Sequence, residues 1–361
     1  MTEALYSATA PVFEVEEDVK QELGRDLVRL EVSETTSGLK TLSARFKAIG
    51  NVEGSAQQGQ LYLDGTIVDF GKKLDVSIGP GPEARTIFEG YISGLEAIFK
   101  EGADPQIVVF AEDKLMSLRM THRMKTYKQV TDADIAQAIA SEHGLQAQVD
   151  AEGPTYDVVH QWNMSDLAFL RERARKIQAE IWFGDNALNF KTRDKRTATE
   201  LTLVQGNELI ELQARADLAH QRTKVKVSGY DASQREGVDE EAGSDAIQAE
   251  VSDGRTGPSV LERAFGERIS YRVREAPLTT AEARDWARAE MLRRSRGFVT
   301  AIGTTRSSPD MIVGSKLTFQ GAGRSFDGAG YYAISVRHTY DLKNGHRTHF
   351  VAERATIQEG A

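Results

Sequence analysis

Three histidines near the carboxyl end have the clearest capacity for chemistry. His338, His346 and His349 lie within the stretch HTYDLKNGHRTHF, and imidazole is a common metal ligand and proton carrier. Asn344 and Gly345 predict a two-residue type I′ turn between two strands. That turn would place His338 and His349 on one face and His346 on the other. Three ligands could not then converge, so this strand pairing argues against a metal site.

Two sets of carboxylates are candidates for acid–base chemistry and for calcium binding. Asp166 and Glu172 both lie on one predicted helix, but their six-residue offset turns them well over 180° apart around it. A glycosidase pair drawn from this helix alone is therefore not expected. Asp239, Glu240 and Glu241 lack the alternating oxygen-ligand spacing of a calcium loop. We expect a solvated linker there.

A group of arginines in a third predicted helix forms a candidate basic surface. Its members are Arg284, Arg288, Arg293, Arg294 and Arg296. Such a surface could contact phosphates, but most of these cations lie in the last turn, where they favourably meet the negative end of the helix dipole. The formal net charge of -9 gives nucleic-acid binding no general electrostatic support. We therefore favour a structural role.

Other signatures of catalysis and cofactor binding are missing from the sequence. The stretch GAGRSFDG holds Phe326 at the third glycine position of a dinucleotide loop, and no helix is predicted after it. There is no nucleophile elbow, phosphate-binding Walker loop or H-E-x-x-H motif. The absence of cysteine excludes disulfides, thiolate metal sites and a cysteine nucleophile. We expect no catalytic, cofactor-binding or metal-ligating residues, and no enzyme activity.

The elements that would position these residues are mostly strands. At 361 residues the chain is long enough for roughly two or three domains. Short alternating runs predict strands from residue 11 to 110, and Thr131 caps a predicted helix over 132–143. A second helix is predicted to begin at Asn163 as N-cap, with Leu167, Leu170, Ala174 and Ile177 as its buried stripe.

The later half of the chain predicts further strands and one long helix. Gly184, Asp185 and Asn186 predict the turn of a hairpin, and strand character continues through RTKVKVSGY. The acidic segment 231–259 is glycine-bearing and lacks aromatics, which predicts an exposed, partly disordered loop. A third helix is predicted over 280–296. Residues 1–19 show no secretory signal, and no segment is apolar enough to span a membrane.

An internal repeat links the two β-rich regions. Gly71–Ser93 and Gly314–Ser335 each contain Gly-x-Lys-Leu, a strand, a glycine-rich turn, Phe-acid-Gly and another strand. Both are followed by a strand that ends in Ala-Glu, at VFAED and FVAER. Five features in the same order at comparable separations predict two copies of one β unit.

Four motifs resemble those of one family. The segment QWNMSDLAFLRERARKIQAEIWF is similar to the Q-[YW]-N-x-S-D-x-x-F-L-x-R segment of the phage late control protein D and VgrG spike families. The likeness extends to FEGYISGLE, to EDKLMSLRMTHRMKTYKQVTDADIAQAIASEHGL and to FDGAGYYAISVRHTYDLKNGHRTHFVAER. It covers most of the chain from about residue 85 onward.

The resemblance implies a mostly β, α+β fold of two tube-like antiparallel β-barrels and an α+β domain. We expect a first barrel over 1–113, an α+β domain over 114–205, and a second barrel over 206–361, interrupted by the acidic loop (231–259) and a helical segment (260–297). The implied function is a homotrimeric baseplate hub of a contractile injection system, made in the cytoplasm and assembled into a tail. Its implied partners are a separate spike protein, the inner tube or a tube initiator, and other baseplate proteins. A tail-tip cell-wall hydrolase and a receptor-binding tail protein remain alternatives.

Overall fold

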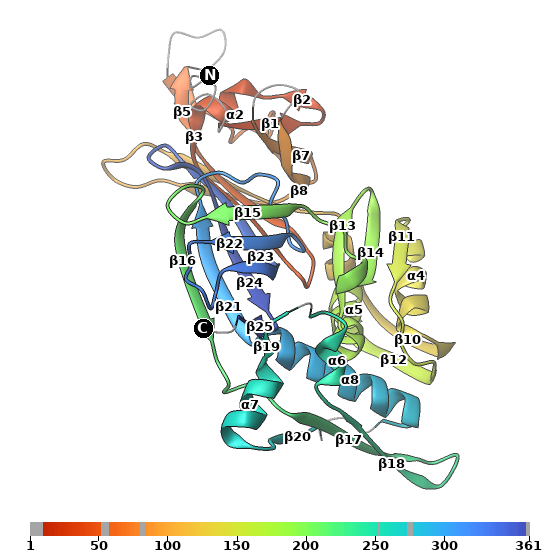
Figure 1. The fold of residues 1–361 in the computed structure, drawn as a ribbon. Coiled ribbons are helices and arrows are strands. Elements are labelled where there is room, and N and C mark those ends of the chain that lie inside the picture. Colours follow the sequence, from red (N-terminus) through yellow and green to blue (C-terminus); the bar gives the residue numbers. More distant parts are fainter. Residues whose placement is uncertain (1–9, 52–57, 80–83, 252, 273–276, 359–361) are drawn as a thin grey trace.

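The fold is known from a computed structural model that describes residues 10–51, 58–79, 84–251, 253–272 and 277–358 (Figure 1). It is mostly β, as the predicted α+β class requires, with most of the α-helices grouped beside the large sheet and one short helix among the first strands. The predictions for residues 1–9, and part of the glycine-rich turn in the first repeat, lie outside the described residues. Among the described helices, none is long and apolar enough to cross a membrane.

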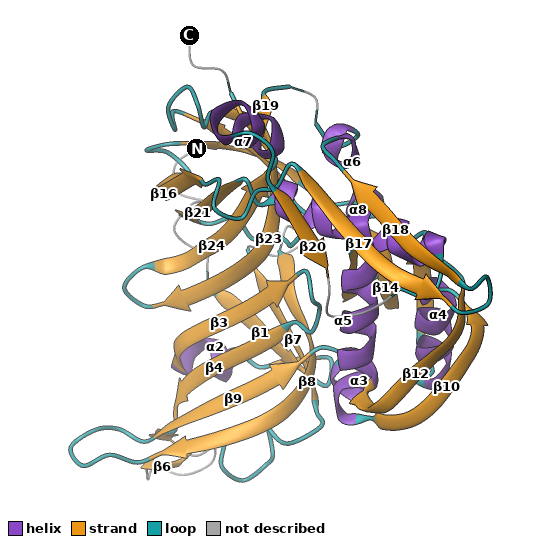
Figure 2. Ribbon diagram, turned by 90° about the horizontal axis from the view of Figure 1, so that it is seen from below, coloured by secondary structure: helices purple, strands orange, loops and turns teal. Residues whose placement is uncertain are grey.

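One 13-stranded sheet forms the larger part of the molecule. Its main path runs β16-β21-β24-β23-β3-β4-β9-β8-β7-β1-β2, with β22 pairing β23 and β15 pairing β22 beside that path. Figure 2 shows the strands from β16 through β21, β24, β23, β3, β4 and β9 to β8 following one another, and the path continues from β8 to β7, β1 and β2. The strand bounds are β1 (Pro11–Val15), β2 (Asp18–Val19), β3 (Leu27–Thr35), β4 (Thr41–Lys47), β7 (Lys73–Ile78), β8 (Arg85–Ile98), β9 (Gln106–Glu112), β15 (Glu200–Val204), β16 (Leu209–Ala216), β21 (Val299–Thr305), β22 (Lys316–Gln320), β23 (Gly328–Asp341) and β24 (Gly345–Arg354).

The two predicted β regions share one continuous sheet. Each region keeps its own hydrophobic core along that sheet. The first module, with β1, β3, β4, β7, β8 and β9, buries Phe13, Phe46 and Phe88. The second module, with β15, β16 and β21 to β24, buries Phe319 and Phe350. Alternating buried positions along these strands match the period-2 pattern of the sequence. The modules are joined where β3 pairs antiparallel with β23.

The predicted repeat has a counterpart in the strand pairing. In the first module Tyr91 pairs with Glu112 and the β8–β9 register shifts after Ile92. In the second module Tyr332 pairs with Glu353 and the β23–β24 register shifts after Ala333. Both members of each pair differ by the same 241 positions (332 − 91 and 353 − 112). The two modules are therefore copies of one unit down to the position of a β-bulge.

The α+β region packs beside the sheet and has its own core (Figure 2). A two-stranded and a three-stranded sheet support its helices. Its elements are α3 (Met116–Met120), β10 (His122–Val130), α4 (Asp132–Glu142), β11 (Gln146–Asp150), β12 (Tyr156–Ser165), α5 (Asp166–Ile177), β13 (Ala179–Gly184), β14 (Ala187–Thr192) and the 3-10 helix η2 (Arg193–Lys195). The remaining elements are α2 (Gln21–Asp26), β5 (Ile49–Asn51), β6 (Gln58–Gln60), β17 (Lys224–Asp231), β18 (Glu236–Ala242), α6 (Asp245–Gln248), β19 (Arg255–Thr256), α7 (Gly257–Phe265), β20 (Ile269–Arg272), α8 (Thr280–Arg296) and β25 (Thr356–Ile357).

The predicted helix starts are right for α4 and wrong for α5. Thr131 caps α4, and a capping box with Asp134 is present. Asn163, the predicted cap of the second helix, instead lies in β12 with a positive φ of 50°. Ser165 caps α5 by accepting from the backbone N–H of Ala168. The strand continues to Ser165 because β12 pairs with β10 on both sides of Asn163, where the register shifts: Trp162 pairs with Met124 and Met164 with Arg123.

The predicted buried stripe of α5 is confirmed, and two charged residues join it. Leu167, Leu170, Ala174 and Ile177 are buried. Arg173 is buried as well, where it stacks on Tyr156 and pairs with Asp132. Lys176 lies over the ring of Trp286 of α8. The mixed charges of this helix are therefore partly structural.

The predicted hairpin turn is confirmed at Asp185 and Asn186. Gly184 pairs with Ala187, and both turn residues have positive φ, as a type I′ turn requires.

The acidic segment 231–259 is not the predicted loop. Glu236–Ala242 forms β18, which pairs antiparallel with β17. Glu241 pairs with Lys224 and Lys226 of β17, while Val238 and Ala242 are buried against the core of the α+β region. The acidic tract folds because the lysine face of the neighbouring strand offsets its charge and its few apolar residues share the opposite face.

The cap of α4 provides a direct stability test. Replacing Thr131 with alanine is expected to lower the free energy of unfolding by about 1 kcal/mol, because the backbone N–H of Asp134 loses its acceptor. Thr131→Ser keeps the oxygen and is expected to lie close to the original protein in a urea titration. Equal losses for serine and alanine would show that the hydroxyl bond does not stabilise the helix.

Candidate functional site

A network of buried charges lies where the two β modules meet the α+β region. We call it the central charge network, and it consists of Glu34, Glu180, Arg193, Arg196, Tyr332 and Glu353. Arg196 donates to Glu34 of β3 at 2.8 Å and to Glu180 of β13 at 3.1 Å. One guanidinium therefore joins the first module to the α+β region.

The second module enters the same network through two residues. Tyr332 of β23 donates to Glu180 at 2.7 Å, and Arg193 donates to Glu353 of β24 at 2.5 Å. Arg193 also stacks over the ring of Tyr332, with 4.0 Å to its centroid. The network thus connects all three parts of the chain with charge-assisted hydrogen bonds.

The side chains of the central charge network are largely shielded from solvent, which strengthens the electrostatic interactions between them. The side chain of Arg196 is 2% exposed and that of Glu180 is 6% exposed. Burial alone would lower the pKa of Arg193, but the nearby carboxylates of Glu353 and Glu180 raise it above its ordinary value. Burial beside Glu180 likewise raises the pKa of Tyr332. Arg193 therefore stays charged and Tyr332 stays neutral at neutral pH, which suits a fixed structural joint better than proton transfer.

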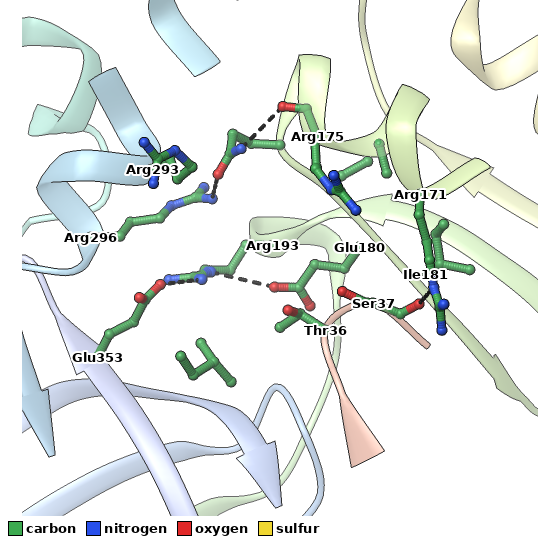
Figure 3. A pocket seen from close by; sticks show the side chains of 14 residues that line it. Thr36, Ser37, Arg171, Arg175, Glu180, Ile181, Arg193, Arg293, Arg296 and Glu353 are labelled. Carbon is green, nitrogen blue, oxygen red and sulfur yellow. Dashed lines mark hydrogen bonds and ion pairs between the residues drawn. The ribbon is translucent and has the colours of Figure 1, made fainter. Parts of the chain in front are cut away.

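A cavity of about 230 Å³ adjoins the network (Figure 3). Arginines line it from α5, η2 and α8, and each of four arginines already has a partner. Arg171 donates to the carbonyls of Ser37 and Gly38, Arg293 pairs with Glu290, and Arg296 pairs with Glu250. With Arg193 held as described, four of the five arginines that line the cavity are held by carboxylate or carbonyl partners, and Arg175 is the fifth.

The arginines near the end of α8 have structural partners, as the favoured interpretation expects. Arg293 and Arg294 both pair with Glu290 one turn earlier. Arg294 also donates to the carbonyl of His220. Arg284 lies 3.8 Å from the carboxylate of Asp285. Ion pairs on and beside the helix, more than the helix dipole alone, hold these side chains.

Asp166 is brought into a hydrogen-bond cluster that does not include Glu172. Its carboxylate accepts from Arg123, Gln161 and His143. Although burial opposes it, these donors hold the pKa of Asp166 below its ordinary value. A carboxylate fixed in its charged form and used by three donors orients the start of α5, and is a poor general acid.

The predicted histidine arrangement is wrong, because β23 and β24 pair three residues away from the register that a two-residue turn at Asn344 and Gly345 implies: Tyr340 pairs with His346 and not with His349. Asp341 pairs with Gly345, so the loop between β23 and β24 has three residues instead of two. Asp341 accepts from the backbone N–H of Asn344, and Gly345 takes a φ of 65°. This side-chain-stabilised turn replaces the type I′ turn.

The shifted register brings a different histidine pair together. His338 and His346 stack with ring centroids 5.3 Å apart, whereas His349 lies on the other face against Thr304 and Thr339. His338 contacts the carbonyl of Met311 at 3.1 Å. Burial lowers the pKa of His338 to about 3 and that of His346 to about 4, so both rings are neutral near pH 7. Across the described ranges, no group of three or more His, Asp or Glu side chains is arranged to hold a metal ion.

The central charge network was missed from sequence because its members are far apart along the chain. Glu34, Glu180 and Glu353 have no common local motif. One signal was present: Glu353 is the acid of the Ala-Glu ending that the repeat shares with Glu112. In the first copy Glu112 pairs with Arg119 at 2.6 Å. The repeated acid therefore anchors an arginine beside the sheet in both modules.

Solved structures that are similar in fold include three proteins of phage tails and of a secretion system. The 43 kDa tail protein of prophage MuSo2 from Shewanella oneidensis matches with TM-score 0.68 and 13% identity, covering 96% of this chain and 99% of that one. The tail protein from Neisseria meningitidis MC58 matches with TM-score 0.68 and 11% identity, over 96% and 97%. The E. coli c3393 protein is a type VI secretion component similar to the T4 tail proteins gp27 and gp5. It matches with TM-score 0.57 and 14% identity, over 93% and 76%.

These matches span nearly the whole of the two tail proteins, so the chain has the same fold as these tail proteins. No curated protein matches the sequence. Among protein families, the Alg8 N-terminal domain matches residues 48–341, which is most of the chain. The chain therefore belongs to the Alg8 N-terminal domain family.

Proposed function

We propose that the protein is a non-enzymatic, homotrimeric baseplate hub of a contractile injection system. The observation that carries this proposal is the equivalence of the two β modules within one continuous sheet. Three chains with two equivalent modules each would present six similar units around a threefold axis. Such a ring can meet a sixfold inner tube on one side and a threefold spike on the other.

The same proposal names the partners and the place of action. The hub would carry a separate spike protein, start the inner tube and contact other baseplate proteins of a phage tail or tail-like particle after synthesis in the cytoplasm. The likeness in fold to tail proteins supports this role. The saturated charges of the central network favour a rigid joint over a catalytic cleft.

We also propose a division of the chain that follows the three hydrophobic cores. Residues up to 113 form the first module. The centre of the α+β domain ends before β15, and not at residue 205 as expected, because Leu203 of β15 is buried in the core of the second module. The rest of the chain holds the second module, and the segment inserted into it packs on the α+β region. Val225 and Val227 of β17, and Trp286 and Met291 of α8, belong to the α+β core.

The first test is the mass of the assembled protein. Light scattering at micromolar concentration is expected to give three times the 39.8 kDa chain mass. Mixing with the spike and inner tube proteins of the same system is expected to give ring-shaped particles in negative-stain images. A strict monomer in the presence of both partners would contradict the hub. Clearing of peptidoglycan by the purified chain would favour the tail-tip hydrolase instead.

A further inference from the structure

The joint between the two modules inside one chain has a defined register. β3 pairs antiparallel with the second half of β23, from Thr35 opposite Ser335 to Arg29 opposite Asp341. On one face of this joint Leu30 lies opposite Tyr340, which packs on the core of the first module. On the other face Arg337 lies 3.9 Å from Glu31.

The repeat assigns an equivalent to each strand of that joint. β8 corresponds to β23 because both pair with the following strand through the same register and bulge. β16 corresponds to β3 by the same reasoning. The register between β3 and β4 shifts between Leu27 and Arg29, and that between β16 and β21 shifts between Leu209 and Glu211. A difference of 182 positions relates both residues of this bulge (209 − 27 and 211 − 29).

β8 and β16, the equivalents of β23 and β3, each have an open strand edge: β16 is the first strand of the main path, and β8 is open only along its later part. β7 pairs with β8 only as far as Tyr91, so within the described chain the later part of β8 has a ladder partner only in β9. Likewise β16 has a ladder partner only in β21 among the described strands. The open edge of β8 corresponds to the edge of β23 that pairs with β3. The open edge of β16 corresponds to the edge of β3 that pairs with β23. An uncovered strand edge presents unpaired N–H and C=O groups to another chain.

Transferring the register of the internal joint to these edges gives definite residue pairs. Gly94 takes the place of Ser335 and Asp217 takes the place of Thr35, so Gly94 lies opposite Asp217. The following pairs continue antiparallel from this one. One face then holds Leu95 opposite Ala216, Ala97 opposite Ala214 and Phe99 opposite Leu212. All three pairs are apolar. Phe99 is 58% exposed in the single chain, and Leu212 already packs on the core of the second module.

The other face of the transferred register pairs opposite charges. Glu96 falls opposite Arg215, and Lys100 falls opposite Glu211. A slip of one residue would place Leu95 opposite Arg215 and Phe99 opposite Glu211. Because such a slip places charged residues opposite apolar ones, the apolar pairs and the opposite-charge pairs both favour the transferred register.

The charges also distinguish the two kinds of joint. Inside the chain, Asp341 lies opposite Arg29. At the equivalent open edges the charges have the opposite signs. Lys100 stands at the position that corresponds to Asp341, and Glu211 stands at the position that corresponds to Arg29. Pairing β8 with a second β3 would place Lys100 opposite Arg29, which is repulsive. The exchanged signs therefore favour β8 with β16 and disfavour the wrong combination.

We propose that β8 of one protomer pairs antiparallel with β16 of a second copy of this chain, with Ala97 opposite Ala214. This seam continues the sheet from one protomer into the next in a head-to-tail contact, which forms a ring where the rotation closes. The proposal deepens the proposed trimeric hub, because three such seams would alternate with three internal joints around it.

Engineered disulfides test the register directly, because the chain has no cysteine of its own. Directly opposite residues of an antiparallel pair bring their Cβ atoms to about 4.5–5.5 Å, close enough for an oxidised bond or a short thiol cross-linker. Ala97→Cys mixed with Ala214→Cys is expected to give a covalent dimer, and neither variant alone should do so. The double variant is expected to give covalent species up to a trimer and none larger. Ala97→Cys mixed with Gln213→Cys, one residue out of register, is the matched control.

Each outcome separates the seam from the hub. A trimer by light scattering without the Ala97–Ala214 cross-link would overturn the seam and leave the hub standing. Cross-linked chains longer than a trimer would support the seam and contradict the trimeric hub. Preferential cross-linking of the Gln213 control would overturn the register, and a monomer without cross-links would overturn both.

A charge exchange gives a second, independent readout. Lys100→Glu is expected to weaken association about tenfold, because it places two carboxylates opposite each other at the seam. Adding Glu211→Lys to the same chain is expected to restore association. If the double variant associates no better than Lys100→Glu, the pairing of these two residues is wrong.

Discussion

Replacing Arg196 with alanine is expected to lower the free energy of unfolding by about 3 kcal/mol. Its guanidinium is shared by Glu34 and Glu180, and all three side chains are at most 10% exposed. After the change Lys40 remains beside Glu34, and Arg193 and Tyr332 remain beside Glu180. They do not replace the cation between them, so part of the cost of burying two negative charges is left uncompensated.

The controls use neighbours and conservative changes. Lys195→Ala removes the adjacent, exposed cation and is expected to change stability by less than about 0.5 kcal/mol. Arg196→Lys keeps the charge but cannot reach both carboxylates with a planar fork, so an intermediate loss is expected. Urea titration monitored by tryptophan fluorescence gives the comparison.

The Arg196 variant also tests whether the network joins the three parts of the molecule. If it does, limited proteolysis is expected to cut faster between residues 193 and 199, where the chain passes from the α+β region to the second module. Equal stability and equal cleavage for Arg196→Ala and Lys195→Ala would show that the buried pairs do not hold these parts together.

Short-range patterns predicted much of this fold, and their failures have physical reasons. The Thr131 cap and the Asp185–Asn186 turn depend on residues within a few positions of each other, so their sequence is sufficient. Asn163 satisfied the same local rule for a cap, yet pairing of β12 with β10 extends the strand past it. Tertiary pairing overrode a correct local preference.

The acidic strand β18 was missed for the same kind of reason. Glu and Asp disfavour strands on average, and the segment has few apolar residues. What makes it fold is the lysine face of β17 and the core beneath it, neither of which lies within the segment.

The candidate site lay further beyond the reach of local patterns. Glu34 and Arg196 are separated by 162 positions and meet only because the first module, the linker and the α+β region converge. The repeat was the exception, because duplication leaves a signal over long distances. It predicted two equivalent units, and the strand register extends that equivalence to residue pairs that no single motif contains.

Acidification is expected to destabilise the second module through the His338–His346 pair. The pKa of His338 is lowered to about 3 and that of His346 to about 4, from an ordinary value of 6.5. Burial is the first cause for both, and for His338 the neighbouring His346 adds to it. Between these values and pH 6.5 the unfolded chain binds more protons than the folded one, so stability falls as pH decreases. The stabilisation is full above about pH 6.5 and is lost progressively down to about pH 4 and below.

The surroundings explain why neither ring accepts a proton readily. His338 contacts the carbonyl of Met311 and the hydroxyl of Thr348, while His346 contacts Ser307. The pKa of His338 is further lowered by Lys40, and that of His346 by Arg347. Protonating either ring would therefore add a cation to a site that already has cations around it and no carboxylate partner among these contacts.

The expected slope is at most about 1.4 kcal/mol per pH unit for each histidine. Urea titrations at pH 7.5, 6.0, 5.0 and 4.5 are expected to show a steep loss in the original protein. The double variant His338→Gln, His346→Gln is expected to be less stable at pH 7.5 but to lose less on acidification. Asp113, whose pKa burial raises to about 6, works in the opposite direction, because its neutral form is favoured in the folded state. Since Asp113 is the same in both proteins, the difference between the two pH profiles isolates the histidines. Parallel profiles would mean that the buried pair does not titrate on unfolding.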